Sequence, residues 1–226
     1  MSRHFTANGD LSRSRAAVAA GSLTILAMGS SSIQGHGASR PELSFVPLLE
    51  IGLERRLPGV AVTVINKGIG GETAMETAGR LEAEVAMAMP DLVIWQLGTN
   101  DVLRDRPLAD VLADFHRGAD ILNRLGVDVL LIDPQRLPDE TMDMNFKARN
   151  PGLDVMSRHI DAEAAASHYA VLHRFRAMQD WSGLDRGGVG PDDLHLNDGG
   201  YACWAAIAAE GLASAIQPGT TRPPRD

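Results

Sequence analysis

Three consecutive serines, Ser30, Ser31 and Ser32, follow an apolar run over Leu23–Met28 and a glycine, Gly29. A short apolar run of this kind predicts a buried strand, and the serines and glycines after it predict a loop that displays hydroxyl groups. A serine hydroxyl is a weak nucleophile until a neighbouring base takes its proton. The loop therefore predicts a nucleophile for acyl transfer, whose base must come from another part of the chain.

One of the seven histidines, His195, has an aspartate three residues before it, Asp192. On a tight turn, this carboxylate can hold one ring nitrogen and leave the other facing a serine. Asn197 or Asp198 can cap the helix expected next, and the positive end of that helix would keep the imidazole neutral, as a base requires. Without the serine loop, the same pair would be an ordinary loop histidine beside a local aspartate.

Acyl transfer also needs hydrogen-bond donors for the negative oxygen of the transition state. Gly71 ends a glycine-rich segment before an expected helix, so its backbone N–H is a candidate. Asn100, after the expected strand at 92–97, offers a side-chain amide. Taken singly, each has a plain structural reading, as a glycine-rich turn and as a turn cap. We interpret Asp101, the next residue, as structural or as a support for the residues of the site.

Strand and helix patterns alternate along the chain, which predicts a parallel sheet with helices on both faces. Short apolar runs predict five strands, at Leu23–Met28, Val60–Ile65, Leu92–Leu97, Val127–Ile132 and Ala170–Leu172. Longer amphipathic segments predict helices at Leu11–Ala20, Ser44–Arg56, Glu72–Met89, Leu108–Leu125, Leu153–Ser167 and Asp198–Ile216. Ligands bind such sheets at the carboxyl ends of the strands, which is where the serines, Gly71 and Asn100 lie.

Several other functions lack their sequence signals. The spacing from Gly29 to His36 does not fit a phosphate-binding loop, and Thr73 stands where a dinucleotide fingerprint needs its last glycine. Clustered His and Cys ligands are absent from the sequence, so we predict no metal and no cofactor. The formal net charge of -8 argues against nucleic acid as a partner.

We expect one domain over residues 1–216 and a disordered tail over 217–226, which is rich in Pro, Thr and Arg. Arg13 and Arg15 before the apolar stretch Ala16–Met28 resemble a signal peptide, but cleavage there would remove the serine strand. We therefore expect a cytoplasmic protein as the chain is given, or a periplasmic or secreted one if a signal peptide has been removed. No run predicts membrane insertion, and the sequence leaves the oligomeric state open.

Four segments together resemble the SGNH hydrolases, the GDSL-type esterase/lipase family. The first block matches Gly29–Gly35, the second Asn66–Thr73, the third Gly98–Asp101 and the last Asp192–His195, in the family's order. This resemblance implies a three-layer α/β/α sandwich around a five-stranded parallel sheet, flavodoxin-like in appearance.

The same resemblance implies a role for each matched residue. Ser31 would be the nucleophile, with His195 as its base and Asp192 as the orienting acid. The oxyanion hole would be formed by the N–H groups of Ser31 and Gly71 and by the amide of Asn100.

Three positions depart from the family's pattern. Ser30 replaces an aspartate, Ile33 replaces a hydroxyl residue, and Leu196 replaces a proline after the histidine. None of these is a reacting group, so we expect changes in the support of the turns rather than a loss of activity.

Together, these expectations predict a metal-independent serine esterase that forms an acyl-enzyme. We expect small acyl groups as substrates, including acetyl esters of carbohydrates, with Met178 and Trp181 near the mouth of the site. An acyltransferase, or a thioesterase or lysophospholipase, could use the same triad. A binding module that has lost catalysis is the alternative from another class.

Overall fold

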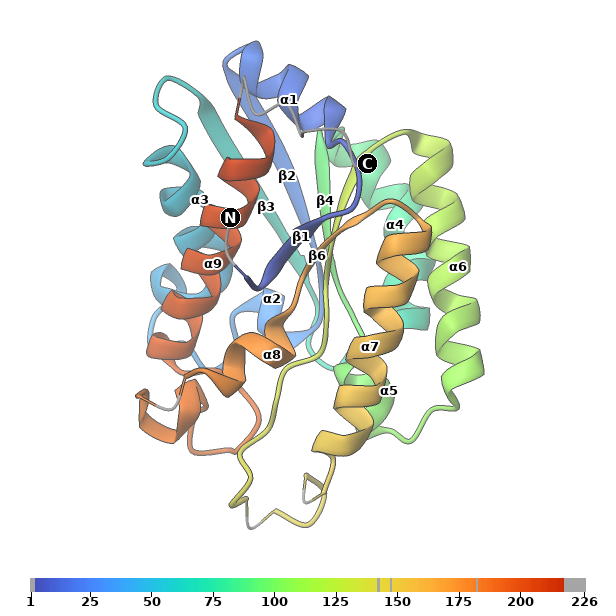
Figure 1. Ribbon diagram of the computed structural model, residues 1–226, viewed down its shortest axis with the longest axis vertical. Coiled ribbons are helices and arrows are strands. Elements are labelled where there is room, and N and C mark those ends of the chain that lie inside the picture. The colour runs from blue at the N-terminus through green and yellow to red at the C-terminus, as the bar shows by residue number, and fades with distance from the viewer. Residues whose placement is uncertain (1–2, 142, 147, 182, 218–226) are drawn as a thin grey trace.

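A mixed sheet lies at the centre of the computed structural model, which describes residues 3–141, 143–146, 148–181 and 183–217 (Figure 1). Its strands run in the order β1-β6-β5-β4-β2-β3. The five parallel strands are β2 (Ser22–Gly29), β3 (Ala61–Gly68), β4 (Leu92–Gln96), β5 (Asp128–Ile132) and β6 (Ala170–Leu172). These match the five predicted strands, and the predicted α/β/α sandwich is confirmed.

The described part of the chain adds a sixth strand that the sequence analysis did not predict. This strand, β1 (Phe5–Ala7), pairs antiparallel with β6, so that Thr6 lies opposite Val171. The prediction of a five-stranded sheet is therefore wrong by one edge strand. A three-residue strand with a single large apolar residue is too short to produce a periodic signal.

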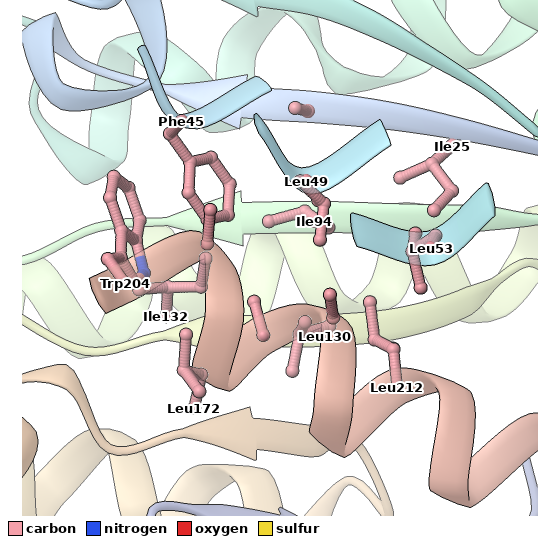
Figure 2. Packing of buried hydrophobic residues seen from close by; sticks show 14 of the residues in the cluster. Ile25, Phe45, Leu49, Leu53, Ile94, Leu130, Ile132, Leu172, Trp204 and Leu212 are labelled. Carbon is pink, nitrogen blue, oxygen red and sulfur yellow. The ribbon is translucent and has the colours of Figure 1, made fainter. Parts of the chain in front are cut away.

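Helices cover both faces of the sheet. On one face, α1 (Ser12–Ala19), α3 (Phe45–Glu54) and α9 (Asp198–Ile216) pack together (Figure 1). Phe45 of α3 stacks on Trp204 of α9 with ring centroids 3.7 Å apart, and aliphatic side chains from the strands lie against both helices (Figure 2). The other face carries α4 (Ala74–Ala88), α6 (Leu108–Leu125) and α7 (Asn150–Ala166).

Short helical segments at strand exits position the residues of interest. Two of them, α2 (Ser31–Gln34) and α5 (Thr99–Leu103), begin directly after β2 and β4. A third, α8 (Arg174–Gln179), follows β6, and two 3-10 turns lie at Pro41–Leu43 and Asp185–Gly188. The sequence patterns predicted loops at these places because elements of three to six residues show no full amphipathic period.

The sheet and its helical layers extend from residue 5 to residue 216, and we infer one domain over this range. Within the described residues, no helix combines the length and the apolar character that crossing a membrane requires. Residues 218–226 lie outside the described residues, so the disorder expected for the tail stays a prediction.

Candidate active site

The serine loop brings one of its three hydroxyls to a histidine. Ser31 is the first residue of α2, and its Oγ lies 3.1 Å from Nε2 of His195. The hydroxyls on either side point to other partners. Ser30 donates from both its N–H and its Oγ to Oε1 of Gln96, at 3.0 Å each. Ser32 donates to Oε1 of Gln135 at 3.2 Å. The geometry therefore singles out Ser31.

Asp192 holds the opposite side of the same imidazole. Its Oδ2 lies 2.6 Å from Nδ1 of His195, and its Oδ1 accepts the backbone N–H groups of His195 at 2.9 Å and Leu194 at 3.1 Å. A carboxylate only accepts hydrogen bonds, so the ring proton lies on Nδ1 and the lone pair of Nε2 faces Ser31. This tautomer is the one that a general base for Ser31 needs.

The electrostatics of this pair keep the carboxylate ionised. Partial burial raises the pKa of Asp192, but the hydrogen bonds from His195 and Leu194 outweigh burial and lower its pKa below the ordinary value. His195 also precedes α9, whose N-terminus is capped by Asn197: its side chain accepts the N–H of Gly200 at 3.0 Å. Of the two predicted caps, Asn197 is therefore the one that the structure shows.

The glycine-rich loop and Asn100 meet beside the serine. A Cβ atom at Gly70 would lie 3.9 Å from Cβ of Ser31, so this loop passes close to the nucleophile. Asn100 donates one of its two amide hydrogens to the carbonyl of Glu72 at 2.8 Å, which ties α5 to the same loop. Its second amide hydrogen is left for another acceptor.

Two backbone donors at this point are also unused. No residue that the structure describes accepts the N–H of Ser31 or of Gly71. Gly71 has a φ of +83°, a conformation that favours glycine, and a Cβ atom there would lie 3.2 Å from Nη2 of Arg104. Ser31, Gly71 and Asn100 thus offer three available donors, and their role as an oxyanion hole stays a prediction.

Asp101, next to Asn100 on α5, joins this helix to α4. Its buried carboxylate accepts the first N–H of α4, from Ala74, at 3.1 Å to each oxygen. Arg106 donates to the same carboxylate at 2.9 Å and to Asp114 of α6 at 2.7 Å. These contacts agree with the structural role expected for Asp101, since they fix α5 against α4.

Two glutamines at strand ends support the serine loop and were not singled out from the sequence. Gln96 is the last residue of β4, and Gln135 follows β5. Both are 2% exposed. Gln135 accepts from Ser32 and donates to the carbonyl of Leu194, so it joins the serine loop to the histidine loop. An amide side chain at the carboxyl end of a mostly apolar strand, or within a few residues after it, is the signal that could have identified them.

The two residues expected near the mouth lie in different surroundings. Met178 lines a cavity of about 380 Å³, whose other lining residues include Arg136, Leu137, Arg186, Val189 and Asp193. Trp181 packs in the hydrophobic core and does not line this cavity. The triad itself is not part of the lining, although Asp193 lies next to Asp192 in the chain. A substrate contact for Met178 and Trp181 stays a prediction.

Two groups of described side chains come close enough to share a cation. One group is Asp133, Asp161 and His173. In this group Nδ1 of His173 pairs with Asp161 at 2.8 Å and Nε2 with the hydroxyl of Thr6 at 2.9 Å, while Asp133 accepts from Ser157 and from the N–H of Phe175 instead. The other group is His36, Asp192 and His195. Its ligand atoms lie at the triad itself.

Comparison with known proteins shows the family of the chain. The model of the Non-GDSL lipase-like family matches residues 2–196. That description suits a first block in which serines stand around Ser31 in place of the Gly-Asp-Ser-Leu pattern. No curated relative matches the sequence.

Solved structures share the fold over most of the chain. TesA superposes with a TM-score of 0.68 at 25% identity, covering 86% of this chain and 98% of TesA. A two-domain esterase active on acetylated mannans superposes with a TM-score of 0.70 at 23% identity, and the match covers 95% of this chain and 57% of the esterase chain. A catalytic mutant of Axe2, an acetylxylan esterase from Geobacillus stearothermophilus, superposes with a TM-score of 0.68 at 20% identity. The match covers 86% of this chain and 94% of the Axe2 chain. Because the mannan esterase and Axe2 are less than 25% identical to this chain, their similarity shows the fold alone.

Proposed function

The chain belongs to the Non-GDSL lipase-like family, and from this premise we propose that it is a serine esterase that hydrolyses esters of small acyl groups through an acyl-enzyme. One observation carries the proposal, which is the contact series from Ser31 through His195 to Asp192, at 3.1 Å and 2.6 Å. A serine, an imidazole and an ionised carboxylate in this order form the apparatus of nucleophilic acyl transfer.

The proposed reaction proceeds in two halves. Oγ of Ser31 attacks the ester carbonyl while its proton passes to Nε2 of His195, and Asp192 stabilises the imidazolium that forms. The carbonyl oxygen becomes negative and accepts from the N–H groups of Ser31 and Gly71 and from the amide of Asn100. His195 then gives its proton to the leaving alcohol as the C–O bond breaks. Water attacks the acyl-enzyme in the same manner and releases the acid.

The surroundings of the site favour an ester with a polar alcohol part. The cavity beside the histidine loop is lined by apolar groups together with the charged pairs Arg136–Asp139 and Arg186–Asp193. Such a lining suits a hydroxylated molecule better than an alkyl chain. Two structural neighbours act on acetylated mannans and acetylated xylan. We propose acetyl esters of carbohydrates as the substrate class on these two grounds.

The mechanism is tested with p-nitrophenyl acetate. Replacing Ser31 with alanine removes the nucleophile, and we expect the rate to fall by at least about 1000-fold. Ser30→Ala and Ser32→Ala are the matched controls, because each removes a neighbouring hydroxyl that does not face His195. Both should keep activity within about tenfold of the wild type. Equal rates for the wild type and Ser31→Ala would reject the mechanism.

The substrate class is tested by two series on the same enzyme. In the first, p-nitrophenyl esters from acetate to octanoate report on the acyl subsite, and we expect kcat/KM to fall with chain length. In the second, acetate release is measured from acetylated xylan and acetylated mannan. A rate that rises towards octanoate, with no acetate released from either polysaccharide, would leave the triad in place but reject the substrate class.

A further inference from the structure

His36, in the loop after α2, lies against the imidazole of His195. The two ring centroids are 4.1 Å apart and the planes are tilted by 51°. His36 is exposed, and neither of its ring nitrogens has a hydrogen-bond partner among the residues that the structure describes. An imidazole with two available nitrogens therefore stands beside the triad, in a place that the proposed acyl transfer does not use.

Backbone contacts fix the loop that carries this imidazole. The N–H of His36 donates to the carbonyl of Ser31 at 2.9 Å, and its carbonyl accepts the hydroxyl of Tyr201 at 2.6 Å. Gly37, with a φ of +92°, is packed so closely that a Cβ atom would lie 2.8 Å from Cβ of His195 and 2.5 Å from the carbonyl of Leu196. The loop is thus held against the histidine loop, and only the side chain of His36 is free to turn.

We propose that His36, Asp192 and His195 bind a divalent cation with the ligand preferences of zinc, and that this binding inhibits the enzyme. Each of the three offers one ligand atom, and these atoms lie within 4.8 Å of one another. Zinc holds imidazole nitrogen and carboxylate oxygen at about 2.0–2.2 Å in a tetrahedron, which places ligands roughly 3.4 Å apart. Rotation of the exposed His36 ring brings its ligand atom closer, the carboxylate of Asp192 shifts from its present 2.6 Å contact with Nδ1 of His195, and a water molecule fills the fourth position.

Inhibition follows from the positions of the ligand atoms on His195. Its Nδ1 donates to Asp192, and its Nε2 accepts from Ser31. A cation on Nε2 occupies the lone pair that takes the proton of Ser31. A cation on Nδ1 displaces the proton that orients the ring. With either nitrogen, the bound enzyme has no working base. The inhibition rests on the proposed function, whereas the binding of the cation does not.

The first experiment measures hydrolysis of p-nitrophenyl acetate against the concentration of zinc chloride, with each variant normalised to its own zinc-free rate. We expect zinc to inhibit the wild type and EDTA to restore the rate. His36→Ala should raise the concentration for half-inhibition by at least about tenfold. His116→Ala is the control, because His116 is also exposed but pairs with Glu163 at 2.9 Å, away from the triad. Equal half-inhibition of His36→Ala and the wild type would overturn the proposal.

The second experiment separates the cation site from the proposed esterase. Isothermal titration calorimetry of zinc chloride into Ser31→Ala should show one strong site per chain, which weakens in the Ser31→Ala, His36→Ala double variant. This binding needs no turnover, so it would support the site even if the wild type hydrolysed no ester. An active esterase that gives no zinc binding in the calorimeter would overturn the site and leave the proposed function standing.

Discussion

The buried carboxyl group of Asp133, at the end of β5, predicts that the protein becomes less stable as the pH rises from about 4 to about 6. This residue is fully buried. Burial raises its pKa from 3.8 to about 6, although hydrogen bonds from Ser157 and from the N–H of Phe175 and the nearby charge of Arg174 oppose this shift. The folded chain therefore holds a proton that the unfolded chain releases in this range.

The size of the effect follows from the two pKa values. Below about pH 4 the group is protonated in both states, and its full contribution to stability is present. Through the window between 3.8 and about 6 that contribution is lost, and above it both states are ionised. At about 1.4 kcal/mol for each pH unit, the loss amounts to about 3 kcal/mol. This is a large part of the free energy of unfolding of an ordinary domain.

The test compares the wild type with Asp133→Asn in urea unfolding from about pH 3 to pH 7. Asparagine does not titrate, and it can keep both contacts: its oxygen accepts from Phe175 and its amide donates to the hydroxyl of Ser157. We expect the difference in unfolding free energy between the two proteins to change by about 3 kcal/mol across this range, in favour of the variant at pH 7.

A second aspartate supplies a control of opposite sign. Hydrogen bonds from Ser39 lower the pKa of Asp198, so its contribution is present above the ordinary pKa and is lost on acidification. Asp198→Asn should reduce the loss of unfolding free energy on acidification and leave unchanged the decrease between about pH 4 and pH 6 that Asp133 causes. Parallel pH profiles for the wild type and Asp133→Asn would refute the reasoning about Asp133.

Two further predictions concern turnover. Asn100→Ala removes one oxyanion donor, and kcat should fall by about 100-fold to 1000-fold while KM for p-nitrophenyl acetate changes little; a loss below tenfold would show that Asn100 faces no developing charge. Gln135→Leu cuts the link between Ser32 and the carbonyl of Leu194. It should lower kcat by about tenfold through misplacement of His195 against Ser31, while the urea midpoint shifts by an amount equivalent to roughly 1 kcal/mol; a shift in stability with unchanged kcat would make Gln135 structural only.

The long elements were predictable because each carries a full period of its own. The helices predicted at Leu108–Leu125 and Asp198–Ile216 have these bounds in the structure. The strand predicted at Val60–Ile65 instead extends to Gly68, because it pairs with β2 along its whole length, up to the pair Gly29 and Gly68. That extension depends on a partner strand, which no local pattern can show.

Some residues of the candidate site were likewise predictable from the sequence, and others were not. Asp192 and His195 were identified because they lie three residues apart, and Ser31 because its loop carries a local pattern of serines and glycines. The blocks that contain them also resemble a known family. Gln135 contacts the carbonyl of Leu194, 59 residues further along the chain, and His36 contacts His195 across a much longer stretch of chain. Contacts of this kind arise from the packing of loops at the sheet edge, so sequence spacing gives no signal for them. The structure was needed to find them.

The short strand β1 has a consequence for how the molecule behaves in solution. It covers the outer edge of β6. Its Phe5 packs tightly against α9, since a Cβ atom added at Gly211 would lie only 2.3 Å from Cγ of Phe5. An uncovered strand edge presents unpaired backbone groups to other chains and promotes aggregation. A protein shortened beyond Ala7 would lose the backbone pairing of β6 and the packing of Phe5 against α9, so we expect it to associate more readily than the full chain.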